Sequence, residues 1–261
     1  MGEVTIYEKR EHIAFVTMDR PAARNSYNNQ SHAELSNIWK DIRADNNIRA
    51  VVLTGAGREA FCAGRDVKEL SEFQKQGKLV PRYDPADSNY NVFGHLAHYE
   101  INKPIIGAIN GFVAGGGMMF FFACDMRVMN EEAWLGDLHA NIGQIGSAEK
   151  FAMYMPLAIA SEMVYTNHRL GAKRAYELGL GNKVVPYEQV LPEAMKLAEA
   201  VCDMAPLSVQ RGKEVIQALL KIPEGVSRLS KHYAAGLRLT EDGKEGPLAF
   251  AQKRKPQWKG K

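Results

Sequence analysis

Short apolar segments alternate with helix-like patterns along the first two thirds of the chain. Ile13–Met18, Ala50–Thr54 and Ile105–Ile109 are short, mainly apolar runs followed by glycine or proline, which is typical of buried strands. Asn29–Ala44 instead repeats apolar residues at helical spacing, which predicts one buried helical face: Leu35, Ile38, Trp39 and Ile42. This alternation predicts an α/β fold with parallel strand pairing.

The last part of the chain shows helical patterns alone. After Tyr187 the expected helices are Leu191–Met204, Pro206–Leu220, Gly225–Leu239 and Gly246–Lys253. The chain is therefore expected to divide into an α/β core, residues 1–190, and a helical region, residues 191–261. Within the core, the segment Gln74–Tyr90 is polar and contains two prolines, so it is expected to form a loop.

Composition favours a soluble protein of a reducing compartment. Hydrophobic residues make up 46% of the chain and charged residues 24%, as in ordinary globular proteins. The three cysteines, Cys62, Cys124 and Cys202, are widely separated, which disfavours a disulfide framework and a CxxC metal site. The sequence shows no secretory signal, and its longest apolar stretch, Gly111–Cys124, is too short and glycine-rich to cross a membrane. We therefore expect a cytoplasmic protein without a membrane segment.

The net charge of +3 owes much to a basic tail: Lys253, Arg254, Lys255, Lys259 and Lys261. A basic tail can contact nucleic acid. A solvated tail is the simpler interpretation, so nucleic-acid binding is not expected.

Two segments share one design, in which a buried strand runs into a tight loop and then a helix. In the first, the loop is Phe61–Asp66. In the second, a glycine-rich turn is expected at Gly111–Gly117 and contains the three glycines Gly115–Gly117. Such loops leave backbone N–H groups free at a helix start, and two N–H groups that converge make an oxyanion hole. A single loop of this kind is more often explained by close helix–strand packing than by a catalytic site, and it is the presence of both that favours the second interpretation. Neither matches the dinucleotide or the Walker phosphate-binding pattern.

Other segments add to these loops: Asp19–Pro21 with Asn25, Ala50–Leu70, Lys103–Gly111, Cys124–Asp125, Ala172–Gly179 and Glu245–Arg254. Together they resemble the crotonase (enoyl-CoA hydratase/isomerase) superfamily nearly end to end. The tail and Pro156–Leu170 are similar to those of carnitinyl-CoA dehydratases.

The resemblance implies a spiral of ββα units in residues 1–190 and a helical trimerisation region in residues 191–261. It implies acyl-CoA thioester substrates and a homotrimer, or a hexamer built as a dimer of trimers. It also implies an oxyanion hole formed by the backbone N–H groups of Arg65 and Gly116, which would hold the thioester oxygen as it gains enolate character.

Four further residues match positions that contact coenzyme A in the family. Arg24 stands where basic residues approach the phosphates, and Ala63 stands where the backbone meets the adenine. Phe250 and Lys253 match a tail that reaches the nucleotide of a neighbouring subunit. A surface arginine and simple helix packing are the alternative interpretations of Arg24 and Phe250. Coenzyme A enters as part of the substrate, so no separate cofactor is expected.

No metal site is expected either. His95 and His98 have the spacing of one helical face, but the sequence offers no evident third ligand.

The acid–base positions depart from the family pattern. A typical enoyl-CoA hydratase uses two glutamates around one water, one as base and one as acid. Met119 stands at the first of these positions and cannot move a proton. His139 stands at the second and is a candidate general base, with Asp137 as the residue that orients it or acts in its place. The alternative is a neutral loop histidine. Glu149 is expected to face solvent at a helix start.

These residues leave three functions open. The first is an enoyl-CoA hydratase/isomerase-like lyase that stabilises a thioester enolate. The second is a C–C bond hydrolase, or another atypical crotonase, with His139 as base. The third is a non-catalytic paralogue that binds CoA thioesters or RNA.

Overall fold

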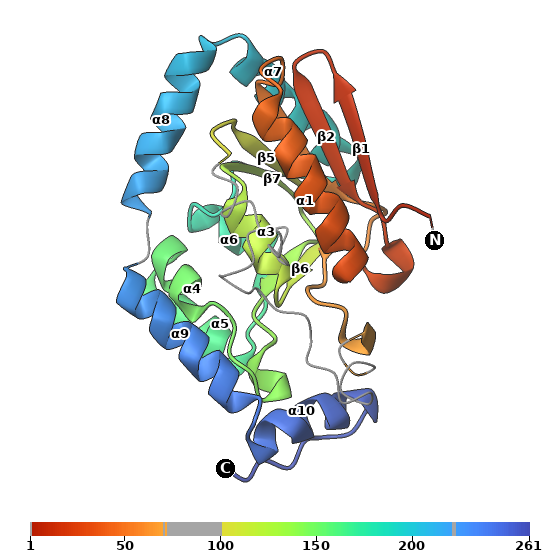
Figure 1. Ribbon diagram of the computed structural model, residues 1–261, viewed down its shortest axis with the longest axis vertical. Coiled ribbons are helices and arrows are strands. Elements are labelled where there is room, and N and C mark those ends of the chain that lie inside the picture. Colours follow the sequence, from red (N-terminus) through yellow and green to blue (C-terminus); the bar gives the residue numbers. More distant parts are fainter. Residues whose placement is uncertain (1, 70, 72–100, 221–222) are drawn as a thin grey trace.

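The computed structural model describes residues 2–69, 71, 101–220 and 223–261 (Figure 1). The loop expected at Gln74–Tyr90, and the two histidines His95 and His98, lie outside the described residues. In the part that is described, the chain forms two sheets surrounded by helices, and the last helices extend down one side of the molecule (Figure 1).

The larger sheet has the strand order β1-β2-β3-β5-β7-β10, and the smaller has the order β4-β6-β8-β9. The strands of the larger sheet are β1 (Thr5–Arg10), β2 (Ile13–Met18), β3 (Ala50–Gly55), β5 (Ile105–Ile109), β7 (Met126–Asn130) and β10 (Lys183–Val185). Those of the smaller sheet are β4 (Ala60–Cys62), β6 (Phe112–Ala114), β8 (Trp134–Gly136) and β9 (Leu170–Gly171). From β3 to β8, successive strands alternate between the two sheets, which is the expected spiral.

Pairing is parallel except at two places. β1 pairs antiparallel with β2, and β8 pairs antiparallel with β9. The parallel strands β4, β6 and β8 end at the same edge of the smaller sheet. The loops that follow them are therefore brought together at this edge.

Alternation along the strands buries both faces of the larger sheet. Val51 and Leu53 of β3 pack towards α1 (Asn29–Ala44), which contributes the buried Leu35 and Trp39. Neighbouring strand residues point to the opposite face, where α7 (Tyr187–Cys202) buries a row of small side chains against them: Val190, Ala194 and Ala198. The expected buried strands and the amphipathic helix at 29–44 are confirmed.

The remaining helices are α3 (Gly117–Ala123), α4 (Ala148–Tyr154), α5 (Leu157–Thr166), α6 (Ala172–Glu177), α8 (Pro206–Leu219), α9 (Glu224–Leu237) and α10 (Glu241–Ala251), with short 3-10 turns η1 (Pro21–Ala23) and η3 (Ala140–Ile142). The boundary expected after residue 190 falls inside α7, which packs on the larger sheet. Packing on that sheet therefore extends through α7, and α8 to α10 form the helical extension beyond it (Figure 1).

Three local predictions were wrong. The glycine-rich turn expected at Gly111–Gly117 contains strand β6, and the loop expected from Phe61 overlaps β4. Strands of three residues are too short to show a periodicity of their own. Helix α10 begins at Glu241 rather than Gly246, because the Thr240 side chain accepts a hydrogen bond from the Gly243 N–H and caps an earlier start.

None of the described helices is both long and apolar enough to cross a membrane.

Candidate active site

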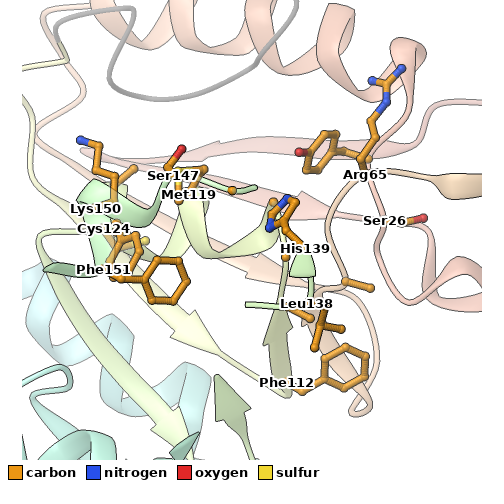
Figure 2. Close-up of a pocket in the computed structure, with 18 of the residues that line it drawn as sticks. Ser26, Arg65, Phe112, Met119, Cys124, Leu138, His139, Ser147, Lys150 and Phe151 are labelled. Carbon is orange, nitrogen blue, oxygen red and sulfur yellow. The ribbon is translucent and has the colours of Figure 1, made fainter. Parts of the chain in front are cut away.

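The loops that follow β4, β6 and β8 border one large cavity of about 2700 Å³, part of which is shown in Figure 2. Helices α3, α4, α8, α9 and α10 supply further parts of its wall. Seven of the eight site residues expected from the sequence line this cavity: Arg24, Ala63, Arg65, Gly116, His139, Phe250 and Lys253. The eighth, Asp137, is buried behind His139.

The loop after β4 pairs with Tyr27 on one side and directs the Arg65 N–H to the opposite side. Tyr27 forms a parallel bridge here: its N–H donates to Gly64 O at 2.9 Å, and its O accepts from the Asp66 N–H at 2.9 Å. Backbone groups of successive extended residues point in opposite directions. The Arg65 N–H therefore points away from Tyr27, and it donates to no group of the described residues.

Backbone hydrogen bonds and backbone conformation hold the loop after β6 in place. The Gly115 N–H donates to Gly136 O at 3.0 Å, and Gly115 has a φ of +51° that favours glycine. The Gly116 carbonyl accepts from the Met119 N–H at 3.2 Å. In the described part of the chain the Gly116 N–H has no acceptor, so it resembles the Arg65 N–H in being available to a ligand.

The two loops touch each other at their glycines. A Cβ added at Gly64 would lie 2.9 Å from the Gly116 nitrogen, and a Cβ added at Gly116 would lie 2.1 Å from the Tyr27 hydroxyl oxygen. Only glycine leaves room for this approach. Burial raises the pKa of Tyr27, so its hydroxyl is a neutral group beside the loop. No pattern in the sequence singled out Tyr27.

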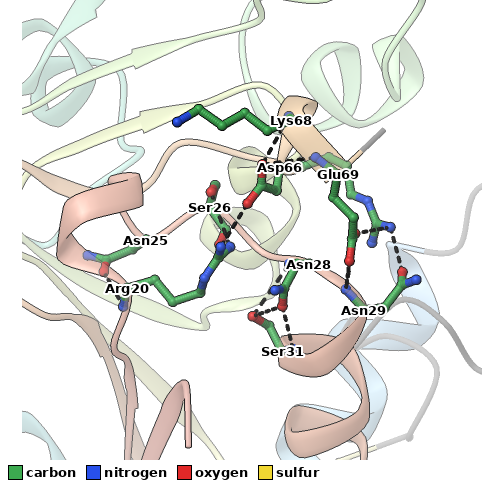
Figure 3. A network of polar contacts seen from close by, with 10 residues as sticks. Arg20, Asn25, Ser26, Asn28, Asn29, Ser31, Asp66, Lys68 and Glu69 are labelled. Atoms are coloured by element: carbon green, nitrogen blue, oxygen red, sulfur yellow. Dashed lines mark hydrogen bonds and ion pairs between the residues drawn. The ribbon is translucent and has the colours of Figure 1, made fainter. Parts of the chain in front are cut away.

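Side chains around these loops form a dense polar network (Figure 3). The Arg65 guanidinium donates to Glu69 at 2.7 Å and to Asn29 at 2.5 Å, which leaves its backbone as the part that the cavity can use. Arg20 donates to Asp66 at 2.8 Å and to the Ser26 carbonyl at 2.6 Å. Burial alone would raise the pKa of Asp66, but the hydrogen bonds from Arg20 and the backbone lower it.

The loop after β8 carries the acid–base candidates. His139 Nδ1 and a carboxylate oxygen of Asp137 form a short hydrogen bond, and the Asp137 side chain is 2% exposed. Because Asp137 occupies Nδ1, the other ring nitrogen, Nε2, is the one left to meet a ligand. The His139 side chain is 27% exposed and lines the cavity (Figure 2). The structure therefore brings His139 and Asp137 together as a pair.

Glycines on both sides make room for this pair. A Cβ added at Gly146 would lie 2.5 Å from His139 Nδ1 and 3.1 Å from an Asp137 oxygen. A Cβ added at Gly115 would lie 3.8 Å from His139 Cε1, so the histidine ring stands beside the loop after β6. Gly146 was not recognised from the sequence, because its effect depends on residues brought to it by the fold.

The two remaining positions of interest also line the cavity. Met119 is half-buried on α3 and packs on the apolar core, so the cavity wall is apolar at this point. Glu149 lies in the first turn of α4, as expected, but it is half-buried and lines the cavity. The prediction that Glu149 faces solvent was wrong, because α4 packs over the cavity rather than outside it.

The residues expected to contact coenzyme A fall at two places on the wall. The Ala63 N–H donates to Arg24 O at 3.0 Å, so these two residues are adjacent. The Arg24 side chain is exposed and pairs with Glu59 at 2.7 Å. Phe250 and Lys253 lie at the end of α10, and both are exposed. They line the cavity of their own chain, whereas the tail was expected to reach a neighbouring subunit.

Among the described residues, no three histidine, cysteine, aspartate or glutamate side chains gather closely enough to hold a metal ion.

Comparison with known proteins places these features in context. Residues 8–261 match the family model described as enoyl-CoA hydratase/isomerase. The chain is 36% identical over 259 residues to an (E)-benzylidenesuccinyl-CoA hydratase of Thauera aromatica, covering 97% of this chain and 98% of that protein. It is 34% identical over 262 residues to a carnitinyl-CoA dehydratase of Proteus mirabilis, covering 97% of each.

Solved structures give the same result. A crystal structure of carnitinyl-CoA hydratase from Mycobacterium avium superposes with a TM-score of 0.88 at 34% identity, and all of both chains is covered. An enoyl-CoA hydratase from Bacillus anthracis superposes with a TM-score of 0.72 at 29% identity. The expected fold and the resemblance to carnitinyl-CoA dehydratases are thus confirmed.

Proposed function

The chain belongs to the enoyl-CoA hydratase/isomerase family, and from this premise we propose that it adds water to, or removes water from, an acyl-CoA thioester through a stabilised enolate. The observation that carries the proposal is the His139–Asp137 pair, which opens on the cavity beside the loop after β6. The relatives named as hydratases and dehydratases support the same reaction class.

In this proposal the backbone N–H groups of Arg65 and Gly116 receive the thioester oxygen. Both lack an acceptor among the described residues, and the Gly64–Gly116 contact brings their loops together. As the enolate forms, negative charge gathers on the thioester oxygen, where two fixed donors stabilise it. Loss of one such donor costs about 3 kcal/mol in the transition state.

One histidine is sufficient for the proton transfers. His139 Nε2 removes a proton from water as the oxygen bonds to the β-carbon, and the electron pair of the double bond moves into the thioester to form the enolate. The imidazolium then returns the same proton to the α-carbon, so atoms and charge balance. Asp137 stabilises the imidazolium between these steps. Met119 takes no part in the proton transfer, and it provides an apolar wall.

Coenzyme A is proposed to lie along the part of the wall that holds Arg24 and Ala63, with Phe250 and Lys253 opposite. The proposed steps use only groups of this chain and of the substrate. Turnover is therefore expected to be unchanged by a chelator, which steady-state rates with and without EDTA will check.

A homotrimer, or a hexamer of two trimers, is proposed as the working assembly. Helices α8 and α9 expose large apolar side chains that a lone chain would leave in water: Leu207, Val215, Ile216, Leu219, Leu229 and Tyr233. Light scattering on the purified protein will give the mass directly.

The test of the proposed reaction is a mass-spectrometric turnover assay with crotonyl-CoA, a branched enoyl-CoA, an aromatic enoyl-CoA and a cyclic β-keto acyl-CoA. We expect an enoyl-CoA to gain one water, and His139→Ala to lower kcat by about 100- to 10,000-fold while CoA binding persists. His168→Ala is the matched control, because His168 is an exposed histidine away from the cavity wall.

A C–C bond hydrolase is the second candidate, favoured by the single base and the apolar residue at Met119. It would add water to the cyclic β-keto thioester, open the ring, and leave the enoyl-CoAs unchanged. A third result, binding of thioesters without turnover and without an effect of His139→Ala, would contradict both enzymes and favour a binding protein.

A further inference from the structure

Lys150 lies on the cavity wall as a cation that has no partner in the part of the chain that the structure describes. It is the third residue of α4, is half-buried, and lines the cavity with Met119 and His139. Its Nζ forms no ion pair or hydrogen bond with any group of the described residues. Glu149 acts on it only through space, without a contact, and partial burial lowers the pKa of Lys150.

The other buried or half-buried cations of this wall that the structure describes have partners: Arg127 donates to backbone carbonyls, and three more form ion pairs. Arg20 contacts Asp66 at 2.8 Å, Arg65 contacts Glu69 at 2.7 Å, and Lys213 contacts Asp125 at 2.7 Å. An unpaired ammonium that has lost part of its water is costly unless a ligand supplies the missing anion. Lys150 therefore differs from the structural cations around it.

The Ser147 hydroxyl lies beside Lys150. The Lys150 N–H donates to Ser147 O at 2.9 Å, so the two residues belong to one helical turn, and side chains three apart share a face. Ser147 lines the cavity, and its hydroxyl makes no capping hydrogen bond for α4. The pair offers one charged and one neutral donor to the same space.

Lys150 and Ser147 lie at the end of the cavity where the proposed mechanism places the acyl group. The histidine ring stands beside Gly115 on one side and Gly146 on the other, and Ser147 follows Gly146 directly. In Figure 2 the labelled residues Arg65, His139, Met119, Ser147 and Lys150 follow one another across the cavity. A thioester held at the Arg65 loop, with its reacting carbons at His139, would extend its acyl group towards Lys150.

We infer that Lys150 and Ser147 bind a carboxylate on the acyl group, so that the preferred substrates are CoA thioesters of dicarboxylic acids. This inference rests on the proposed function, because it takes the thioester to be held between the two loops. The aromatic side chains near this end of the cavity, Phe122, Phe151 and Tyr154, pack on one another and leave room for an apolar part of the same acyl group.

The test measures binding of two saturated thioesters of equal chain length, succinyl-CoA and butyryl-CoA, to the full-length protein by calorimetry. The wild type should bind succinyl-CoA at least about tenfold more tightly, as expected for a charge-assisted hydrogen bond. Lys150→Met should remove this preference and leave butyryl-CoA binding within about twofold, whereas Lys150→Arg should keep the preference.

Lys68→Met is the matched control, since Lys68 is an exposed lysine of the same wall and its loss changes the net charge equally. It should leave the ratio of the two affinities unchanged. Equal binding of both thioesters by the wild type, or a preference that survives Lys150→Met, would overturn the inference alone. Failure of both thioesters and of free CoA to bind would overturn the proposed function with it.

Discussion

The two sides of the cavity are built by different means. On one side, the loops after β4 and β6 present backbone N–H groups, held by glycines in contact and by the network around Arg20 and Asp66. On the other side, the segment from β8 to α4 presents side chains: His139, Ser147 and Lys150. The difference separates two tasks. Backbone donors suit what every thioester enolate needs, whereas side chains determine which proton moves and which acyl group fits.

The largest loss of activity is expected when a single methyl group is added to the side of the cavity that presents backbone N–H groups. Gly116→Ala places a Cβ 2.1 Å from the Tyr27 hydroxyl oxygen, so the loop must shift and its N–H must move from the position proposed for the thioester oxygen. We expect kcat to fall by about 100- to 1,000-fold with any thioester. Steady-state kinetics with the preferred substrate will measure this.

Gly171→Ala is the control for that variant, because a Cβ at Gly171 meets nothing within 4 Å. Its kinetics should equal those of the wild type. A Gly116→Ala protein that kept its folded structure and its kcat would contradict the assignment of the oxyanion hole to this loop.

The side of the cavity that presents side chains should respond to a substitution that removes no hydrogen-bond donor or acceptor. Gly146→Ala places a Cβ 2.5 Å from His139 Nδ1, which forces the ring away from Asp137. We expect a loss in kcat of about ten- to 100-fold, since a misplacement near 1 Å is costly in an active site. The pH profile of kcat should change as well, because the histidine loses its carboxylate partner.

Gly212→Ala supplies the comparison, as Gly212 lies within α8 with open space around it. It should keep full activity and gain stability, because alanine favours a helix over glycine. Should Gly146→Ala retain both the rate and the pH profile, His139 would not depend on Asp137 for its role.

The smallest expected effect is a loss of stability. It concerns the polar network around Arg20 and Asp66, which supports the side of the cavity that presents backbone N–H groups. The pKa of Asp66 is lowered in the fold, although burial opposes this, because Arg20 and backbone N–H groups donate to its carboxylate. The stabilisation is thus present above the pKa of aspartate in the unfolded chain, about 4, and is lost as the pH falls through the folded value. Asp66→Asn should lower the free energy of unfolding by about 1 kcal/mol at neutral pH.

Urea denaturation at several pH values will test this, with Glu131→Gln as an exposed carboxylate control. The loss caused by Asp66→Asn should shrink as the pH falls below about 4, because the carboxylate is then protonated first in the unfolded chain and, at lower pH, in the folded protein. A difference that stayed constant down to pH 3 would mean that the ion pair with Arg20 does not stabilise the loop.

Much of the fold followed from local patterns. The helix at Asn29–Ala44 and the strand at Ile105–Ile109 have the predicted bounds, since a clear apolar period or a buried run with glycine or proline on either side leaves few alternatives. The strands β4 and β6 were missed, because three residues pair only where a neighbouring strand is provided. The first turn of α10 was missed for a related reason. Gly243 and Gly246 weaken a helix locally, yet they allow it to pack closely on Leu237 and Ile142.

The candidate site was likewise predictable only in part. The family, the two glycine loops and His139 as an acid–base candidate could be predicted from the sequence, because they depend on residue types close together in the chain. The sequence could not show that Tyr27 lies beside Gly116, that Gly146 lies beside His139, or that Lys150 has no partner within the described ranges.

The sequence by itself indicated the alternation of strands and helices, the glycine loops and the family, and it made Met119 and His139 the candidates for the two acid–base positions. Only the tertiary structure decided that His139 pairs with Asp137, that Glu149 faces the cavity, and that Lys150 has no partner among the described residues. The physical reason is that backbone conformation responds to neighbouring residues, whereas contact, burial and the pairing of charges depend on segments that only packing brings together.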